Sequence, residues 1–301
     1  MVLDEFDLFG GLSGPPLPVD TYDLGRGITI SRTYAHLMAP FVMAFAPAEP
    51  GQPHPAPWKP AKGGFGFDIT SQIHVPKEFS AQQWFDRLNT VWWFVALLRF
   101  RATPYITVPV VASMSFSEAA KAKEEIHFWP VEVEPRRLRV EKNASHDIRE
   151  DDLAWIKANW WNAGKLMRVG TEFNLLFQAC DQCIFTTNPS LALLSLWGAL
   201  EGLFSPAKAE LRFRVSANIA AFLEPPGRGR LELQKKVAKL YDARSQAAHG
   251  GSDLPADALA DSYALTKHVI TKVIEANHVP NREDLEEALF SARTPDAYDT
   301  R

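Results

Sequence analysis

The residues LQKKVAKLYDARSQAAHGG, at positions 233–251, determine the fold class of the second half of the chain. Leu233, Val237 and Leu240 recur at three- and four-residue intervals, which is the spacing of an amphipathic helix. The next step of this stripe is Arg244, and two consecutive glycines then end the pattern. The stretch therefore predicts a helix that ends at glycines and carries a cation on its inward face.

The same helical spacing continues on both sides of this stretch, from Leu153 to the C-terminal region. Two dipeptides, Asn188-Pro189 and Ser205-Pro206, each predict an N-cap followed by proline in the first turn of a helix. A further helix is expected to begin at Pro255. These patterns predict an all-helical bundle over residues 146–301.

The first half of the chain has a different pattern, because apolar and polar residues alternate in several short runs. Strands are expected in five segments, at 28–31, 41–45, 65–75, 105–111 and 126–133. Six prolines between residues 47 and 60 predict an exposed loop. A capping box at Ser80 and Gln83 predicts a helix that continues to Leu98. We therefore expect an α+β protein, with a mixed α/β domain over residues 1–145.

Composition and charge narrow the range of functions that the chain could have. The net charge of -4 argues against a generally basic coat for nucleic acid, yet residues 205–249 carry nine Lys/Arg against four Asp/Glu. Two cysteines are too few for a disulfide framework and favour a reducing compartment. The apolar run at 91–98 is too short to span a membrane, and the acidic N-terminus does not resemble a signal peptide. We expect a cytoplasmic protein that has no membrane partner.

The helix at 233–248 brings two chemically useful residues together. Arg244 and His249 lie about 140° apart around the helix and about 7.5 Å apart along it, so a long arginine side chain can reach a phosphate beside the imidazole. An inward guanidinium needs an anion, and Glu201 is the candidate internal partner. Tyr241, Ser245 and His249 follow a second stripe, in which Ser245 is expected to hydrogen-bond and orient His249.

Cations of the same helix are candidates for attracting an RNA backbone through charge that salt screens. They are Arg228, Arg230, Lys235, Lys236 and Lys239. The alternative interpretation, which the sequence supports equally well, is that these five residues form an ordinary solvated helix face.

Three segments together resemble the HEPN superfamily, and its ApeA-like branch in particular. They are residues 196–203 (LWGALEGL), 212–223 (RFRVSANIAAFL) and 240–250 (LYDARSQAAHG), within a resemblance that covers about 150–290. In that superfamily an R-x4-6-H motif is associated with metal-independent RNA cleavage at a site often shared across a homodimer. Arg244 and His249 match its two named positions, and Ser245 occupies the position that is often Asn, Asp or His.

The resemblance implies a HEPN-type endoribonuclease in antiphage defence or a toxin system, with no metal or other cofactor. A phage trigger or an antitoxin is an implied partner, as is a second copy bound through the helical domain. His249 would move a proton and Arg244 would stabilise the charged transition state, giving a 2′,3′-cyclic phosphate. Two alternatives remain open. One is a catalytically inactive HEPN dimer that binds or scaffolds, and the other is a small-molecule enzyme sited in the N-terminal domain, which no motif supports.

Other patterns are interpreted as structural. Cys180 and Cys183 share one face of a helical stripe, so core packing is favoured over a redox or zinc site. The glycines at 63–66 lack the strand-then-helix context of a phosphate loop. The remaining histidines singled out have no metal-ligand spacing and are interpreted as surface residues: His54, His74, His127 and His146.

Overall fold

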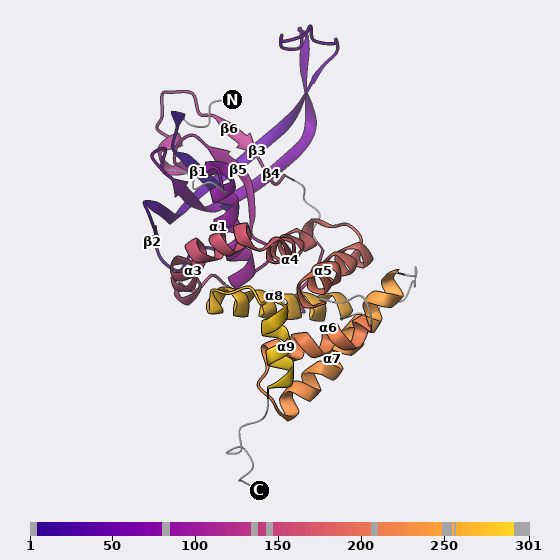
Figure 1. Ribbon diagram of the computed structural model, residues 1–301. Helices are drawn as coiled ribbons and strands as arrows, with labels where there is room; N and C mark the ends of the chain where they lie inside the picture. Colours follow the sequence, from indigo (N-terminus) through magenta and orange to yellow (C-terminus); the bar gives the residue numbers. More distant parts are fainter. Residues whose placement is uncertain are drawn as a thin grey trace. The chain divides into compact units, whose positions relative to one another are not determined.

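The computed structural model describes residues 5–79, 85–133, 138–142, 147–205, 210–248, 255 and 257–291 (Figure 1). Strands dominate the first part of this chain and helices the second, which confirms the expected α+β class. The chain divides into two compact units. The first comprises Met1–Leu98, Ile106–Glu134 and Asp147–Ala154, and the second comprises Arg99–Tyr105, Pro135–His146 and Trp155–Arg301.

The strands described in the first unit form one antiparallel sheet in the order β2-β3-β4-β1-β5-β6. They are β1 (Leu8–Ser13), β2 (Thr21–Gly25), β3 (Ile28–Ala44), β4 (Trp58–Val75), β5 (Thr107–Ala112) and β6 (Phe128–Pro130). Strand β1 lies in the interior of the sheet, with Leu8 opposite Val75 of β4 and Phe9 opposite Ala112 of β5. No strand was predicted at β1, because the centre of this strand consists of two glycines.

Those glycines let helices approach β1 from both sides. A Cβ atom at Gly10 would lie within 3.0 Å of Val91 in helix α1 (Arg87–Arg101), and one at Gly11 would lie within 3.0 Å of Phe116 in the short helix α2 (Phe116–Ala119). Consecutive residues of a strand point to opposite faces of the sheet. Helices α1 and α2 therefore contact opposite faces of the same strand.

Helix α1 (Arg87–Arg101) begins later than the sequence predicts. The Asp86 carboxylate accepts a hydrogen bond from the backbone N–H of Asn89 at 2.7 Å, which satisfies a donor of the first turn. The expected capping box at Ser80 and Gln83 lies outside the described residues. The helix that the apolar spacing predicted is present, with its start supplied by an aspartate.

Strands β3 and β4 form a hairpin much longer than the sequence indicates. The segments 28–31 and 41–45, expected as separate strands, belong almost entirely to the continuous β3, which pairs with β4 as far as Ala44 opposite Trp58. The prolines from 47 to 57 lie in the connection between the strands, whereas Pro60 lies within β4. A two-stranded ribbon tolerates proline because half of its backbone N–H groups point outward and bond no strand.

The strands expected at 105–111 and 126–133 are present as β5 and the shorter β6. Pro130 ends β6 at the edge of the sheet, where the loss of a backbone donor costs little. Pro109 lies instead in the interior strand β5, where the register against β1 shifts between Thr107 and Val110. A bulge at this position therefore accommodates the proline.

The helices described after residue 147 are α3 (Glu150–Val169), α4 (Thr171–Gln182), the 3-10 turn η2 (Cys183–Phe185), α5 (Pro189–Phe204), α6 (Leu211–Leu223), α7 (Arg228–Ala248), α8 (Ala258–Ala276) and α9 (Arg282–Phe290). The side chain of Asn188 accepts from the N–H groups of Ser190 and Leu191, with Pro189 in the first turn. The N-cap expected at Asn188 is thereby confirmed. The helix expected near Pro255 is α8, which begins three residues later.

The N-cap expected at Ser205 is wrong. Ser205 follows the last turn of α5, and its backbone N–H donates to the carbonyl of Glu201, so it is a C-cap. Helix α6 begins only at Leu211, after Glu210 in the left-handed conformation. Pro206 lies outside the described residues. The sequence pattern misplaced the signal because serine before proline is typical of any break between helices.

The core of the second unit centres on Trp197 of α5. This side chain is fully buried, and its indole N–H donates to the Ser262 hydroxyl at 3.0 Å. Cys180 and Cys183 are buried and free, as core packing predicts. Burial raises the pKa of the Cys183 thiol to about 12 and that of Cys180 further still. Both cysteines therefore behave as apolar side chains at neutral pH.

Candidate functional site

Arg244 forms an ion pair with Glu201 in the second unit, as the sequence predicts. The guanidinium Nη2 lies 3.1 Å from Oε1 and 3.3 Å from Oε2 of the carboxylate. The side chains are 27% and 18% exposed, so the pair is neither sealed in the core nor free in solvent. Glu201 comes from α5 and Arg244 from α7, and their pairing fixes the position of the guanidinium near the end of α7.

The arginine keeps hydrogen-bonding capacity after this pairing. Its Nε atom is buried and has no hydrogen-bond partner among the described residues. The guanidinium carbon lies 5.6 Å from the centre of the Tyr241 ring, one turn earlier on the same helix. A partly exposed cation fixed from one side by a carboxylate and from another by an aromatic ring can bind a further anion through the exposed part of its guanidinium.

Tyr241 supports the site from the interior. Its side chain is buried, and its ring stands edge-on to Trp197 with the centroids 5.4 Å apart. Burial raises the pKa of Tyr241, and the Glu201 carboxylate beside it raises that pKa further. The hydroxyl is therefore protonated throughout the neutral range, and the side chain borders both Glu201 and Arg244.

The second stripe expected on α7 is only partly visible. Ser245 is half-buried, and its hydroxyl donates to the backbone carbonyl of Tyr241 at 3.3 Å. His249 lies outside the described residues, one position after the last residue of α7. The contact between Ser245 and His249 remains a prediction, for which the Ser245 oxygen still has lone pairs to accept a proton.

The structure separates the five cations expected to bind RNA into different environments. Lys235, Lys236 and Lys239 are exposed, and Arg228 is exposed but pairs with Glu232 one turn later. Arg228, Lys235 and Lys239 recur at intervals of seven and four residues, so they follow one face of α7. This face is the part of the expected surface that is open to a ligand.

Arg230 has a structural environment. Its guanidinium donates to the backbone carbonyl of Glu224 and to that of Ala288, both at 2.9 Å. These bonds connect the beginning of α7 to the end of α9. The side chain is half-buried, and desolvation lowers the pKa of Arg230. The two carbonyls occupy donors that a phosphate would need.

Two features beside α7 escaped the sequence interpretation. Arg212 of α6 makes a bidentate pair with Asp242, at 2.6 and 2.8 Å, which joins α6 to the motif helix. Phe213 is 61% exposed between two arginines, Arg212 and Arg214. An exposed aromatic ring beside cations can stack on a base. The sequence triplet RFR, which places an aromatic residue between two arginines in a helix whose other residues are mostly apolar, was the signal that could have revealed it.

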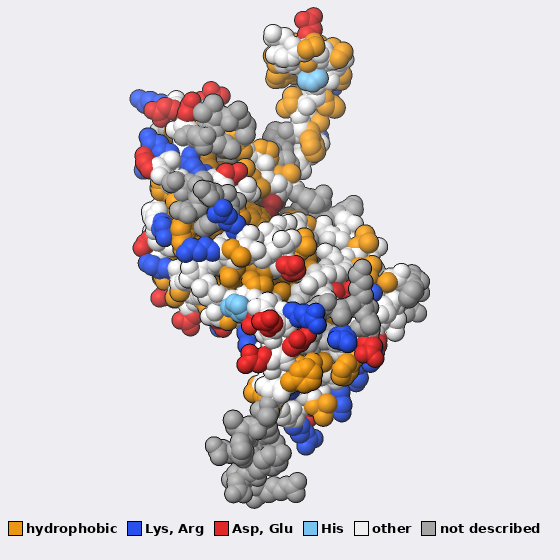
Figure 2. Space-filling model, in the orientation of Figure 1, with side chains coloured by type: hydrophobic (Ala, Val, Ile, Leu, Met, Phe, Trp, Pro, Cys, Tyr) orange, Lys and Arg blue, Asp and Glu red, His pale blue; other side chains and the backbone are white. Residues whose placement is uncertain are grey.

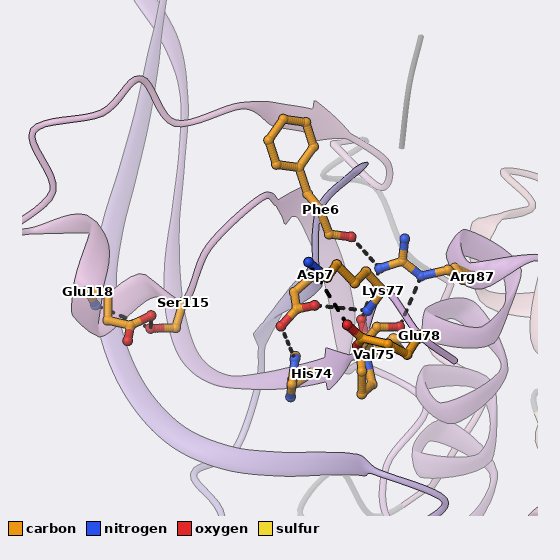
Figure 3. Close-up of polar contacts among 10 residues, drawn as sticks. Phe6, Asp7, His74, Val75, Lys77, Glu78, Arg87, Ser115 and Glu118 are labelled. Carbon is orange, nitrogen blue, oxygen red and sulfur yellow. Dashed lines mark hydrogen bonds and ion pairs between the residues drawn. The ribbon is translucent and has the colours of Figure 1, made fainter. Parts of the chain in front are cut away.

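A second polar cluster lies in the first unit, where Figure 3 shows Asp7, His74 and Arg87 around the start of β1. The Asp7 carboxylate lies 2.9 Å from His74 Nε2 and accepts the Lys77 N–H at 2.8 Å. Burial raises the pKa of Asp7, but these hydrogen bonds outweigh it and the pKa is lowered overall. Arg87 donates to the backbone carbonyl of Phe6. The cluster ties the segment before β1 to β4 and has a structural role.

The part of the chain that the structure describes contains no group of three or more His, Cys, Asp or Glu side chains placed to hold a metal ion. His146, one of the histidines interpreted as surface residues, lies outside that part. None of the helices described has both the length and the apolar character needed to cross a bilayer. Comparison of the chain with protein-family models, curated proteins and solved structures found no match.

Proposed function

We propose that this protein is a HEPN-type endoribonuclease that cleaves RNA without a metal ion. The observation that carries the proposal is the Arg244 guanidinium, which is 27% exposed and which Glu201 anchors through Nη2 at 3.1 Å. Arg244 stands five positions before His249 in the sequence. A fixed cation with spare donors beside a titratable imidazole is what phosphodiester cleavage without a metal requires.

In the proposed reaction, His249 removes the proton of an RNA 2′-hydroxyl, and the resulting alkoxide attacks the adjacent phosphorus. The bond from phosphorus to the 5′-oxygen breaks, and that oxygen takes a proton as it leaves. Arg244 stabilises the negative charge on the phosphate oxygens during the transfer. The products are a 2′,3′-cyclic phosphate and a 5′-hydroxyl, and DNA is spared because it lacks the attacking hydroxyl.

The exposed cationic face of α7 supports an RNA substrate. Lys235 and Lys239 supply positive charge that a phosphate backbone attracts, and Lys236 adds a cation on a neighbouring face. Phe213 offers a ring for an unpaired base. We include Phe213 in the proposed binding surface and give Arg230 a structural role instead.

The proposal also covers the oligomeric state, the cellular location and the biological role of the protein. Two copies would associate through the helical unit, and the protein would act in the cytoplasm, where its two thiols stay reduced. Antiphage defence or a toxin system fits an RNA-cleaving activity that a phage trigger releases or an antitoxin restrains. Residues 1–145 would then supply the sensory or regulatory domain.

A second candidate function is a HEPN dimer that binds or scaffolds without catalysis. The ion pair between Arg244 and Glu201 favours it, because a guanidinium that already has an internal carboxylate needs no external anion. In this candidate the pair stabilises the packing of α5 against α7.

The deciding experiment compares the wild type with His249→Ala and Arg244→Lys in two settings. Each is expressed in a bacterial host, with growth and total RNA followed, and each is purified and incubated with RNA in EDTA. We expect the wild type to stop growth and to leave 2′,3′-cyclic ends, and both variants to lose this activity at least 100-fold. His268→Ala, which changes an exposed histidine of α8, is the matched control and should behave as wild type.

Equal RNA patterns and equal growth for the wild type and His249→Ala would refute the nuclease proposal. If RNA is bound in that case but not cut, the result supports the binding candidate. Cleavage that EDTA abolishes would also contradict the proposal, because it would require a metal ion.

A further inference from the structure

The β3–β4 hairpin extends beyond the rest of its sheet as a two-stranded arm, here defined as residues 38–66 (Figure 1). Pairing within the arm runs from Met38 opposite Gly66 to Ala44 opposite Trp58. Strand β2 pairs with β3 only as far as Ser31, and β1 pairs with β4 only from Ser71 onward. Among the described strands, none therefore covers either edge of the arm.

The arm exposes large apolar side chains, which Figure 2 shows as hydrophobic surface continuing to its tip. Six such side chains are between 43% and 72% exposed: Met38, Phe41, Val42, Met43, Phe45 and Trp58. By contrast, Leu37 and Phe67, just below the arm, pack against the cluster around Ile69 and Phe116. An apolar surface gathered on one element marks a contact site, and a lone two-stranded ribbon is only marginally stable in water.

The open edges limit what the arm can contact. Each edge presents backbone N–H and C=O groups that no strand satisfies, and such groups cost several kcal/mol each in hydrocarbon. A bilayer would cover the side chains but leave these groups without partners. A strand from another protein chain pairs with the free backbone groups and also covers the apolar side chains.

Charge and area point to a second copy of this chain as that partner. The arm contains three charged residues in the sequence, Glu49, Lys59 and Lys62, so two arms meet with little repulsion. The six exposed apolar side chains offer roughly 700 Å² over the two faces of the arm, and pairing two arms edge to edge covers the part of this area that lies beside β3. An antiparallel strand edge is self-complementary under a two-fold axis, which is the symmetry of most homodimers.

The edge formed by β3 is the more regular of the two. Strand β4 carries Pro60, which lacks a donor, and Gly63 and Gly64, which have φ values of 110° and 130°. Strand β3 is continuous past Pro40, and after a register shift between Pro40 and Val42 its residues 42–44 pair in unbroken register with β4. Main-chain pairing is therefore expected along β3.

We propose that two copies of this chain associate through their arms, with the β3 edges paired antiparallel near Met43 and the side chains of Phe41 and Phe45 of each copy packed across the new strand pair. This contact joins the first unit of one copy to the first unit of the other copy. It is independent of the proposed nuclease site and of the dimer proposed through the helical unit, because all of its residues lie in the first unit.

Cysteine cross-linking tests this contact. Cys180 and Cys183 are buried, so a cysteine placed on the surface is the thiol that reacts. Met43→Cys is compared under mild oxidation with Phe290→Cys, a control on α9 whose native side chain is 81% exposed. We expect Met43→Cys to form a covalent dimer at micromolar concentration and Phe290→Cys to form at least tenfold less. Adding Phe41→Asp and Phe45→Asp to Met43→Cys should reduce the dimer at least tenfold.

A shortened variant checks that any loss comes from the arm and not from unfolding. Residues 39–65 are replaced by Asn-Gly between Met38 and Gly66, which lie opposite each other and accept a two-residue turn. The variant should keep the helical circular dichroism of the wild type and lose the arm-dependent association in sedimentation. Equal cross-linking of the two cysteine variants, or a Met43→Cys protein that stays monomeric, would overturn the proposal. Arm-dependent flotation with phosphatidylcholine–phosphatidylglycerol vesicles, in a protein that does not cross-link, would overturn it in favour of a bilayer.

Discussion

Replacement of Glu201 by alanine removes the carboxylate that anchors Arg244, and the cost follows from the geometry of the pair. The change deletes a charged contact of 3.1–3.3 Å between side chains that are less than one third exposed. Hydrogen bonds to charged groups contribute about 1.5–3 kcal/mol in such settings. We expect Glu201→Ala to lower the free energy of unfolding by about 2 kcal/mol, and the melting temperature by about 4–8 °C.

A double-mutant cycle isolates the pair from the rest of each side chain. The free energy of unfolding is measured by urea titration, with helical circular dichroism as the signal, for Glu201→Ala, Arg244→Met and the two combined. We expect a coupling energy of about 1–2 kcal/mol. Glu201→Gln keeps a hydrogen-bond acceptor without the charge and should lose about half as much stability as Glu201→Ala.

A coupling energy near zero would refute the reasoning, because it would mean that Arg244 gains no stability from its carboxylate. A destabilisation of Arg244→Met that persists unchanged in the Glu201→Ala background would have the same meaning. In either case the guanidinium would need another anchor, and Glu201 would lose its place in the proposed site.

Three further predictions concern stability, reactivity and pH. Asp181→Ala breaks a buried ion pair with Arg99, whose side chains are both 2% exposed, and should cost about 3–5 kcal/mol in urea titration; a cost below about 1 kcal/mol would contradict it. Cys180 and Cys183 should resist iodoacetamide at pH 8 until the protein unfolds, since burial raises the pKa of both thiols; rapid labelling of the native protein, read by mass spectrometry, would oppose this. The Arg212 guanidinium lowers the pKa of Asp242, so its stabilising effect is present above the unfolded pKa of about 4 and is lost as the pH falls through the lower folded pKa. The stability advantage of the wild type over Asp242→Asn should therefore shrink in acid below about pH 4, and an advantage that grows in acid would be the contrary result.

The helical half of the fold could be predicted from local signals, because those signals involve neighbouring residues. Asn188 before Pro189 marks a helix start that the structure confirms. Ser205 carries the same local pattern and is a C-cap, because its backbone N–H completes the last turn of α5 and α6 begins six residues later. Local sequence therefore locates the break between two helices. It does not show whether a residue such as Ser205 ends the helix before the break or begins the helix after it.

The sheet was harder to predict, because its strands depend on partners distant in the sequence. Gly10 and Gly11 give β1 no strand propensity, and their role appears only once Val91 and Phe116 are seen beside them. Pro60 argues against a strand unless the strand has an open edge, which the sequence does not show. The length of the β3–β4 hairpin was missed for this reason.

The candidate site contains some contacts that the local sequence predicts and others that depend on residues distant in the sequence. The inward position of Arg244 follows from the helical stripe, and Glu201 could be named as its partner because it interrupts an apolar segment. The bidentate pair between Arg212 and Asp242 could not be named, since two exposed residues on different helices leave no periodic signal. The separation of Arg230 from the other cations likewise depends on carbonyl groups that a sequence does not display.

The two glycines of β1 also limit how this sequence can change over time. Any side chain at Gly10 or Gly11 would collide with Val91 or Phe116, so a substitution requires a compensating loss of volume in the helix opposite. Because the two positions face opposite sides of the sheet, a single change elsewhere cannot relieve both. In a library of random variants, these neighbouring sites should be among the least tolerant in the first unit, and accepted changes at either should arise together with a smaller residue at its helical neighbour.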